Sequence, residues 1–186
     1  MEGSINHWEN RYKKQGNSGE GSYGNEAQEK ANYINNVINK YNIKSINDYG
    51  HGDGNQLTYI KGFKNYYGYD VSDTVREKCI SDFKNKPNYN FISTPEEFNI
   101  ADLAISLDVL YHVVEDNLYK NYLKTLFNIG NLILIYSVDK NSNVTHYFKS
   151  RKFTPYIKEN FPNFELIETT IPNSKDVSMF LYKKIK

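Results

Sequence analysis

The residues best suited to hold a small ligand lie in the glycine-rich segment Asp48-Tyr49-Gly50-His51-Gly52-Asp53-Gly54. Glycine adopts backbone angles that other residues avoid, and it lets a ligand approach the main chain closely. The spacing G-x-G-x-G lacks the third glycine of the G-x-G-x-x-G fingerprint, which serves helix packing beside a pyrophosphate. The segment therefore favours a ligand without phosphates and disfavours an NAD-binding protein.

A carboxylate follows these glycines at an informative distance. Asp70 stands 18 residues after Gly52, close to the offset of roughly 20 residues at which a carboxylate ending the second strand meets both hydroxyls of a ribose. Because a charge at the end of a strand needs a partner, we expect Asp70 to bind a ribose. For Asp48, a role beside the ligand and a structural role as a cap of the loop amides both stay open.

Strands that alternate with helices must position these residues. Helical spacing of apolar residues runs from Ala27 to Tyr41, and further helices are predicted from the apolar faces of residues 75–83 and 118–127. Short strands are predicted at Ile43 to Asn47, Tyr66 to Val71, Tyr89 to Ile92 and Leu103 to Leu107, and the apolar run Leu132 to Tyr136 is typical of a central parallel strand. This alternation predicts right-handed crossovers and a mostly parallel sheet.

The pattern changes after Ser137. A helical stretch near Phe153 to Asn160 precedes two strand-like segments, Phe164 to Ile171 and Val177 to Ile185, whose polar connection suits a hairpin. The predicted fold class is therefore α/β: a doubly wound, Rossmann-like, seven-stranded and mostly parallel sheet, with an antiparallel last strand and helices on both faces.

Residues 1–26 lack sustained periodicity and read as an arm with a short helix near Trp8 to Lys14, followed by one domain at residues 27–186. The glycines of the arm make it costly to order, while Trp8, Tyr12 and Tyr23 offer apolar surface that closes a cleft. We expect the arm to be a lid that orders over a bound ligand rather than a permanently packed element.

Composition narrows the function classes. With 23 Lys and Arg against 22 Asp and Glu, the chain has no general field that would draw it to nucleic acid or an anionic membrane. The longest apolar runs fall short of the roughly 18 residues that span a bilayer, and the polar start is unlike a signal peptide, so we expect a cytoplasmic protein. Cys79 is expected to be a buried core thiol, and the four histidines lack zinc-ligand spacing, so no metal site is expected.

Over about residues 27 to 186 the sequence resembles class I S-adenosylmethionine-dependent methyltransferases, in particular a compact bacterial or viral type. Ile46 to Gly54 is similar to the first motif of that family and Ala101 to Asp116 to the fourth. A Ser-Gly-x-Gly-Ser-Tyr-Gly arm at Ser18 to Gly24 and a late His-x-x-x-x-Arg-x-Phe-Thr at His146 to Thr154 match the same type. His51 and Asn47 depart from the small or apolar residues usual at their positions.

The resemblance implies S-adenosylmethionine as the cofactor. It assigns the backbone of Gly50 and Gly52 to the methionine part, Asp70 to the ribose, Val71 to the adenine, with residues near Thr94 to Glu96 at its edge, and Leu107 to Val109 to the methyl-donor end. The remaining cofactor-binding candidates are Asp48, Asp53, Trp8, Arg11 as a partner of the cofactor carboxylate, and Tyr23 as a lid element.

The implied reaction transfers a methyl group to an oxygen or nitrogen of a small polar acceptor, with a sugar or nucleotide-sugar in glycan biosynthesis favoured. A hydroxyl acceptor needs a general base, and the candidates are His112, His146 and Asp108. Two alternatives stay open: a nucleic-acid methyltransferase, disfavoured because no basic stripe is present, and a non-catalytic subunit that binds the cofactor. Either a monomer or a homodimer is compatible with the sequence.

Overall fold

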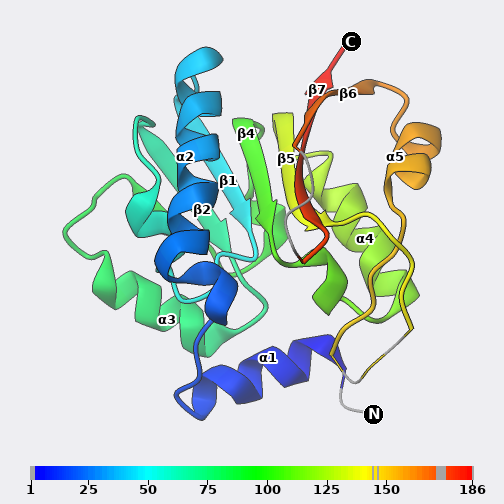
Figure 1. Ribbon diagram of the computed structural model, residues 1–186. Helices are drawn as coiled ribbons and strands as arrows, with labels where there is room; N and C mark the ends of the chain where they lie inside the picture. The colour runs from blue at the N-terminus through cyan, green and yellow to red at the C-terminus, as the bar shows by residue number, and fades with distance from the viewer. Residues whose placement is uncertain (1–2, 144, 146, 171–174, 186) are drawn as a thin grey trace.

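A seven-stranded sheet forms the centre of the computed structural model, which describes residues 3–143, 145, 147–170 and 175–185 (Figure 1). The strands are β1 (Ser45–Tyr49), β2 (Asn65–Tyr69), β3 (Tyr89–Phe91), β4 (Ala101–Leu107), β5 (Gly130–Val138), β6 (Phe164–Thr169) and β7 (Val177–Lys184). Their order across the sheet is β3-β2-β1-β4-β5-β7-β6. The strands therefore wind outward in two directions from β1 and β4.

The strand directions confirm the predicted fold class. β1 pairs in parallel with β2 and β4, and the β2–β3 and β4–β5 pairs are parallel too. Only β7 runs against its neighbours: it pairs antiparallel with both β5 and β6. The predicted strands lie within a few residues of the observed ones.

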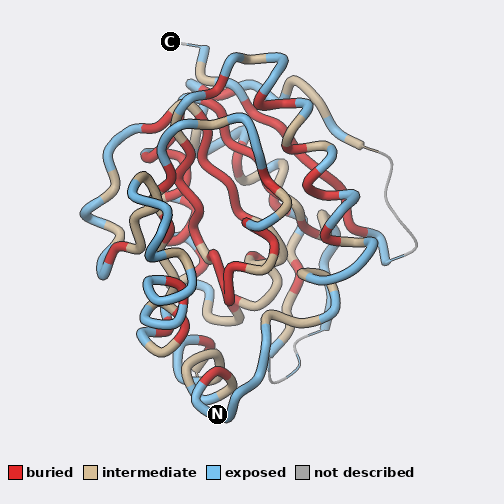
Figure 2. Tube along the Cα trace, turned by 90° about the vertical axis from the view of Figure 1, so that its left-hand side faces the viewer, coloured by how far each residue is buried: buried red, intermediate tan, exposed pale blue. Residues whose placement is uncertain are grey.

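Helices cover both faces of the sheet and give it two separate cores (Figure 1). On one face α2 (Gly24–Lys40) buries its apolar stripe against β1, β4 and β5, and on the other α4 (Asp116–Leu126) and α5 (Thr154–Asn160) do the same. In β5, Leu132 and Leu134 belong to the first core and Ile133 and Ile135 to the second. A strand covered on both sides needs apolar residues at successive positions, which explains the unbroken apolar run. Figure 2 shows these buried strands running through the interior.

α3 (Asp73–Asp82) follows β2 and starts at the N-cap Ser72, whose hydroxyl accepts a hydrogen bond from the Val75 amide at 3.2 Å. Cys79 on this helix is fully buried, as predicted. α1 (Ser4–Lys13) lies across the end of the sheet toward which the parallel strands point (Figure 1). This helix is longer than predicted, and α2 starts at Gly24, three residues before the predicted start. Among the described residues, none of the helices has the length and hydropathy to cross a membrane.

Candidate active site

A cavity opens at the carboxyl ends of β1, β2 and β4. This is the point where the strand order reverses, and in doubly wound sheets ligands bind there. Ten of the predicted site residues line it: Trp8, Asp48, Gly50, Gly52, Asp70, Val71, Leu107, Asp108, Val109 and His112. Asp53, Arg11 and Tyr23 are not among the lining residues, nor are Thr94 to Glu96, and His146 lies outside the described residues.

The glycine loop and Asp70 are built around each other. The backbone amide of Gly52 donates to one Asp70 carboxylate oxygen at 2.9 Å, and the amide of Ser72 donates to the other at 3.0 Å. Gly50 has φ of +99° and Gly52 of +57°, so both occupy the left-handed region that favours glycine. Burial raises the pKa of Asp70 above its ordinary value. The loop thus holds one carboxylate at the cavity wall, at the end of β2.

Asp48 lies deeper, and its carboxylate accepts a hydrogen bond from the Tyr66 hydroxyl at 2.8 Å. Desolvation raises the pKa of Asp48 to about 7. The neighbouring His51 is buried too, and its Nδ1 donates to the Gly52 carbonyl at 2.7 Å. Burial lowers the pKa of His51, so its ring is neutral at the pH where Asp48 titrates.

Asp53 holds the arm instead of facing the cavity. Its carboxylate accepts hydrogen bonds from the Ser18 amide at 2.9 Å and the Tyr23 hydroxyl at 2.7 Å, and its own amide donates to the Ser18 hydroxyl at 2.8 Å. Burial raises the pKa of Asp53, but these hydrogen bonds outweigh burial and the pKa lies below its ordinary value. The contacts of Asp53 and Tyr23 therefore join the arm to the glycine loop.

Arg11 is bound within the arm. Its Nε donates to the Asn17 carbonyl at 2.6 Å, and its guanidinium lies 5.4 Å from the centre of the Trp8 ring. Trp8 lines the cavity, whereas Arg11 does not. Of these two predicted residues, Trp8 therefore lies at the cavity and Arg11 does not.

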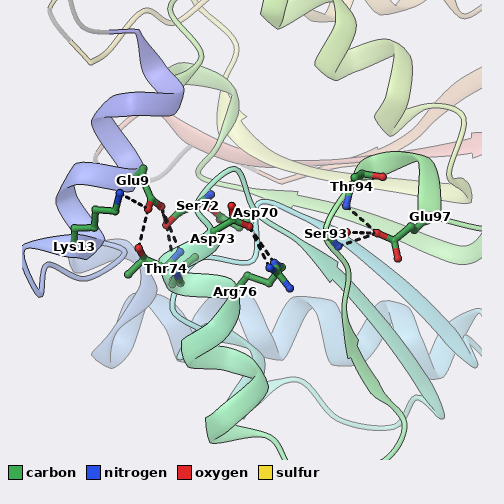
Figure 3. Close-up of polar contacts among 11 residues, drawn as sticks. Glu9, Lys13, Asp70, Ser72, Asp73, Thr74, Arg76, Ser93, Thr94 and Glu97 are labelled. Carbon is green, nitrogen blue, oxygen red and sulfur yellow. Dashed lines mark hydrogen bonds and ion pairs between the residues drawn. The ribbon is translucent and has the colours of Figure 1, made fainter.

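α1 is fastened at two points. From the middle of the helix, Glu9 accepts hydrogen bonds from the Ser72 hydroxyl at 2.5 Å and the Thr74 hydroxyl at 2.8 Å, at the N-terminus of α3 (Figure 3). At its first residue, Ser4, the backbone amide donates to Glu115 at 2.8 Å and the hydroxyl at 2.6 Å. Trp8 lines the cavity between these two anchors, and Ser4 lines it too. The helix is thereby held across the cavity mouth.

The loop after β3 is held in its conformation by hydrogen bonds among its own residues. Glu97 accepts hydrogen bonds from the Ser93 amide at 2.9 Å and the Thr94 amide at 3.0 Å (Figure 3). These contacts hold the turn beside the sheet edge, and its residues do not reach the cavity wall.

At the end of β4, Asp108 is the centre of a buried polar cluster. Lys30 of α2 forms an ion pair with one carboxylate oxygen of Asp108, and the Tyr111 hydroxyl donates to the other. Lys30 is 3% exposed, and its ammonium also lies 5.1 Å from the centre of the Tyr136 ring. Asp108 itself has φ of +61°, a strained angle for a residue with a side chain. With both oxygens engaged, Asp108 is better placed to position its neighbours than to accept a proton.

His112 sits in the short turn η4 (Leu110–His112) beside this cluster. Its Nδ1 is 2.8 Å from the Tyr147 carbonyl oxygen, and the Trp8 ring packs edge-on at a centroid distance of 5.0 Å. Burial lowers the pKa of His112. The lowered pKa favours the neutral imidazole at the cavity wall, the form that accepts a proton.

No protein-family model and no curated protein matches the chain in sequence. Solved structures do match it in three dimensions. The methyltransferase domain of bacterial CtHen1 superposes with a TM-score of 0.68 at 19% identity, covering 84% of this chain and 97% of that one. Magnesium protoporphyrin IX methyltransferase (ChlM) from Synechocystis with bound SAM gives 0.71 at 12% identity, covering 99% and 98%. The N-methyltransferase NodS from Bradyrhizobium japonicum with bound S-adenosylhomocysteine gives 0.66 at 11% identity, covering 87% of each chain.

The chain has the fold of the S-adenosylmethionine-dependent methyltransferases. The two departures from the family's first motif are accommodated within this methyltransferase fold. Asn47 is buried and donates to the carbonyls of Asn99 at 2.6 Å and Ile129 at 2.7 Å, so it ties two loops to β1. The His51 ring has room because β2 carries Gly68: a Cβ atom there would lie 2.9 Å from His51 Cδ2.

Several residues that line the cavity or hold the arm were not predicted from the sequence. Lys30 had a visible signal, since a lysine stands among the apolar positions Ala27, Ala31 and Ile34 of α2. Gln56 lines the cavity from the short turn η2 (Gln56–Tyr59), and neither its Oε1 nor His51 Nε2 has a hydrogen-bond partner within the described ranges. The anchors Ser4, Glu9, Ser18 and Glu115 gave no signal because their partners are remote in sequence.

Proposed function

We propose that this protein is an enzyme that transfers a methyl group from S-adenosylmethionine to an oxygen or nitrogen of a small polar acceptor, with a sugar or nucleotide-sugar favoured. One observation carries the proposal. The Asp70 carboxylate lies at the end of β2, bonded to the Gly52 amide at 2.9 Å, in a cavity at the strand-reversal point of a methyltransferase fold. That is where a carboxylate meets ribose hydroxyls in such folds.

The cavity residues fit this cofactor. Asp70 would accept from the ribose hydroxyls, Val71 would pack against the adenine, and the backbone of Gly50 and Gly52 would lie along the methionine part. The buried, unpartnered Oε1 of Gln56 supports a ligand that carries a hydrogen-bond donor, because a buried polar atom without a partner is costly. Bound S-adenosylmethionine supplies an electrophilic methyl group on a positively charged sulfur.

The chain's own groups then align the acceptor and take up its proton. Trp8, Val113 and Leu118 give the cavity an apolar wall beside His112, and such a wall helps to exclude water around the reacting atoms. With S-adenosylmethionine bound, the acceptor hydroxyl oxygen would take the methyl group, and its proton would pass to a base of the chain. We propose His112 for that base and a positioning role for Asp108; His146 stays a candidate from the sequence alone.

The near-neutral charge of the chain, +1 in total, supports a small acceptor over RNA, because RNA binding draws on clustered cations. We further propose that residues 1–26 act as a lid. Trp8 and Ser18 line the cavity from the arm, so a ligand in the cavity would contact the closed arm directly.

Calorimetric titration with S-adenosylhomocysteine and with NAD tests the cofactor. We expect heat from the first and none from the second, and the reverse result would refute the proposal. The acceptor is then sought by methyl transfer from labelled S-adenosylmethionine to sugars, nucleotide-sugars, nucleotides and RNA. Transfer of the label to a sugar supports the favoured acceptor. Transfer to RNA alone would instead support the nucleic-acid methyltransferase.

A further inference from the structure

The hydrogen bond between His112 and the backbone of Tyr147 fixes where the imidazole proton sits. A carbonyl oxygen only accepts, so the 2.8 Å contact requires the proton on Nδ1. In the neutral ring Nε2 then carries the free lone pair. No hydrogen bond from Nε2 to another residue occurs within the described part of the chain, and His112 lines the cavity. Nε2 is the nitrogen left to accept a proton from a ligand there.

The segment that carries the Tyr147 carbonyl is tied to the turn that carries His112. The Lys149 amide donates to the Tyr111 carbonyl at 2.8 Å, one residue before His112. Arg151 makes the larger connection: its Nη1 donates to the Val113 carbonyl at 2.9 Å and its Nη2 to the Val114 carbonyl at 2.8 Å. These hydrogen bonds therefore join the segment with the Tyr147 carbonyl to the turn with His112.

Two further contacts hold the Arg151 side chain in this geometry. Its guanidinium forms an ion pair with Asp116 at 2.8 Å and stacks over the Tyr119 ring at 4.1 Å. The planar fork of arginine matches two adjacent carbonyls and a carboxylate at once, which lysine cannot do. The Arg151 side chain is 15% exposed whereas Asp116 is 66% exposed, so the guanidinium is covered by the segment it holds although its carboxylate partner faces water.

We infer that Arg151 is a positioning residue: it holds the segment Tyr147–Phe153 so that the Tyr147 carbonyl keeps His112 in the Nδ1–H form, with Nε2 as the base. The inference rests on the proposed methyl transfer for its chemical purpose, since Nε2 would receive the acceptor's hydroxyl proton. The tautomer itself does not depend on that function.

The charged and titratable groups around His112 come from several elements. Asp108 favours the protonated ring, whereas His7 and Arg11 of α1 disfavour it, and burial disfavours it most. The Trp8 and Tyr111 rings complete the surroundings, with centroids at 5.0 Å and 4.7 Å. His112 is accordingly expected to be neutral near pH 7, which makes its tautomer measurable there.

Nitrogen-15 NMR of the full chain, labelled at histidine, tests the inference without cofactor or acceptor. His112→Gln identifies the His112 signals by their loss. We expect the parent protein to show the proton on Nδ1, and Arg151→Gln to show a mixture of tautomers or a shift to Nε2–H. Lys152→Gln is the matched control, because Lys152 is exposed on the same segment and, among the described residues, bonds through its backbone amide and not through its side chain; it should behave like the parent.

A parent ring protonated on Nε2 would overturn the inference, and so would an Nδ1–H ring unchanged in Arg151→Gln. If Arg151→Gln does not fold, Arg151→Lys keeps the charge beside Asp116 but loses the fork, and the same shift is expected. With an acceptor in hand, Arg151→Gln should lower kcat roughly 10- to 100-fold while S-adenosylhomocysteine affinity stays unchanged. If the parent protein does not bind S-adenosylhomocysteine, the proposed function is refuted, but the tautomer measurement stays valid.

Discussion

The ammonium group of Lys30 forms an ion pair with the Asp108 carboxylate across the cavity wall, with the two side chains only 3% and 17% exposed. Removing the cation would leave Asp108 with the Tyr111 hydroxyl but without a countercharge, and breaking a buried ion pair typically costs about 3–5 kcal/mol. We expect Lys30→Met to lower the free energy of unfolding by about that amount in urea denaturation.

Lys40→Met is the matched control for this prediction. Lys40 lies on the same helix and pairs with Glu168 at 3.1 Å, but its side chain is 60% exposed. Exposed pairs contribute about 0–1 kcal/mol, so the control should lose little stability. Equal losses in the two variants would contradict the importance of burial at Lys30.

Asp70→Ala is expected to weaken S-adenosylhomocysteine binding by about 1.5–3 kcal/mol, the range for hydrogen bonds to a charged group. Titration calorimetry measures the change, and melting of the variant checks that it folds. Asp73→Ala is the control, because Asp73 is three residues away, 79% exposed and paired only with Arg76. If Asp70→Ala binds as tightly as the parent, another residue holds the ribose.

The contact of Glu9 with α3 should make arm closure depend on pH. The Ser72 hydroxyl, the Thr74 groups and Lys13 lower the pKa of Glu9 from 4.5 to about 2. Because the folded-state pKa is lowered, the stabilisation is fully present above pH 4.5 and is lost as the pH falls toward 2. Trp8, the only tryptophan, reports arm closure by its fluorescence.

Glu9→Gln removes the charge from this contact and so weakens its hydrogen bonds near neutral pH. We expect faster amide exchange in α1 of the variant, with saturating S-adenosylhomocysteine slowing exchange in both proteins. Lys14→Gln serves as the control, since the Lys14 side chain is exposed at the end of the same helix and does not pair with Glu9. If amide exchange in α1 is the same in Glu9→Gln and in the parent, and does not change with the ligand, the arm is a fixed element and not a lid.

Gly68→Ala should destabilise the fold because the new Cβ atom would lie 2.9 Å from the His51 ring and from Tyr66. Strain of this kind costs about 1–3 kcal/mol. A double-mutant cycle with His51→Ala isolates the pair, and the cost of Gly68→Ala should fall when the ring is absent. A cost independent of His51 would attribute the strain to Tyr66 alone.

The sequence predicts the sheet well because local periodicity encodes it. The apolar run of β5 and the stripe of α2 reflect burial on fixed faces, and the G-x-G-x-G loop with Asp70 reflects a strand-end geometry. The arm is different, since its structure depends on contacts such as Ser4 with Glu115 and Ser18 with Asp53, which no local pattern signals. Asp53 was predicted to face the cofactor because it stands in the loop; its position in three dimensions instead gives it the arm as partner.

The two anchors of α1 also bear on the kinetics of turnover. One anchor lies at Ser72 and Thr74, next to the proposed cofactor residues, and the other at Glu115, close to His112. If residues 1–26 act as the proposed lid, release of α1 would uncover both halves of the cavity, and cofactor and acceptor would exchange through a single opening. Product departure would then show the same solvent-viscosity dependence for the demethylated cofactor and the methylated acceptor, and each product would slow the escape of the other.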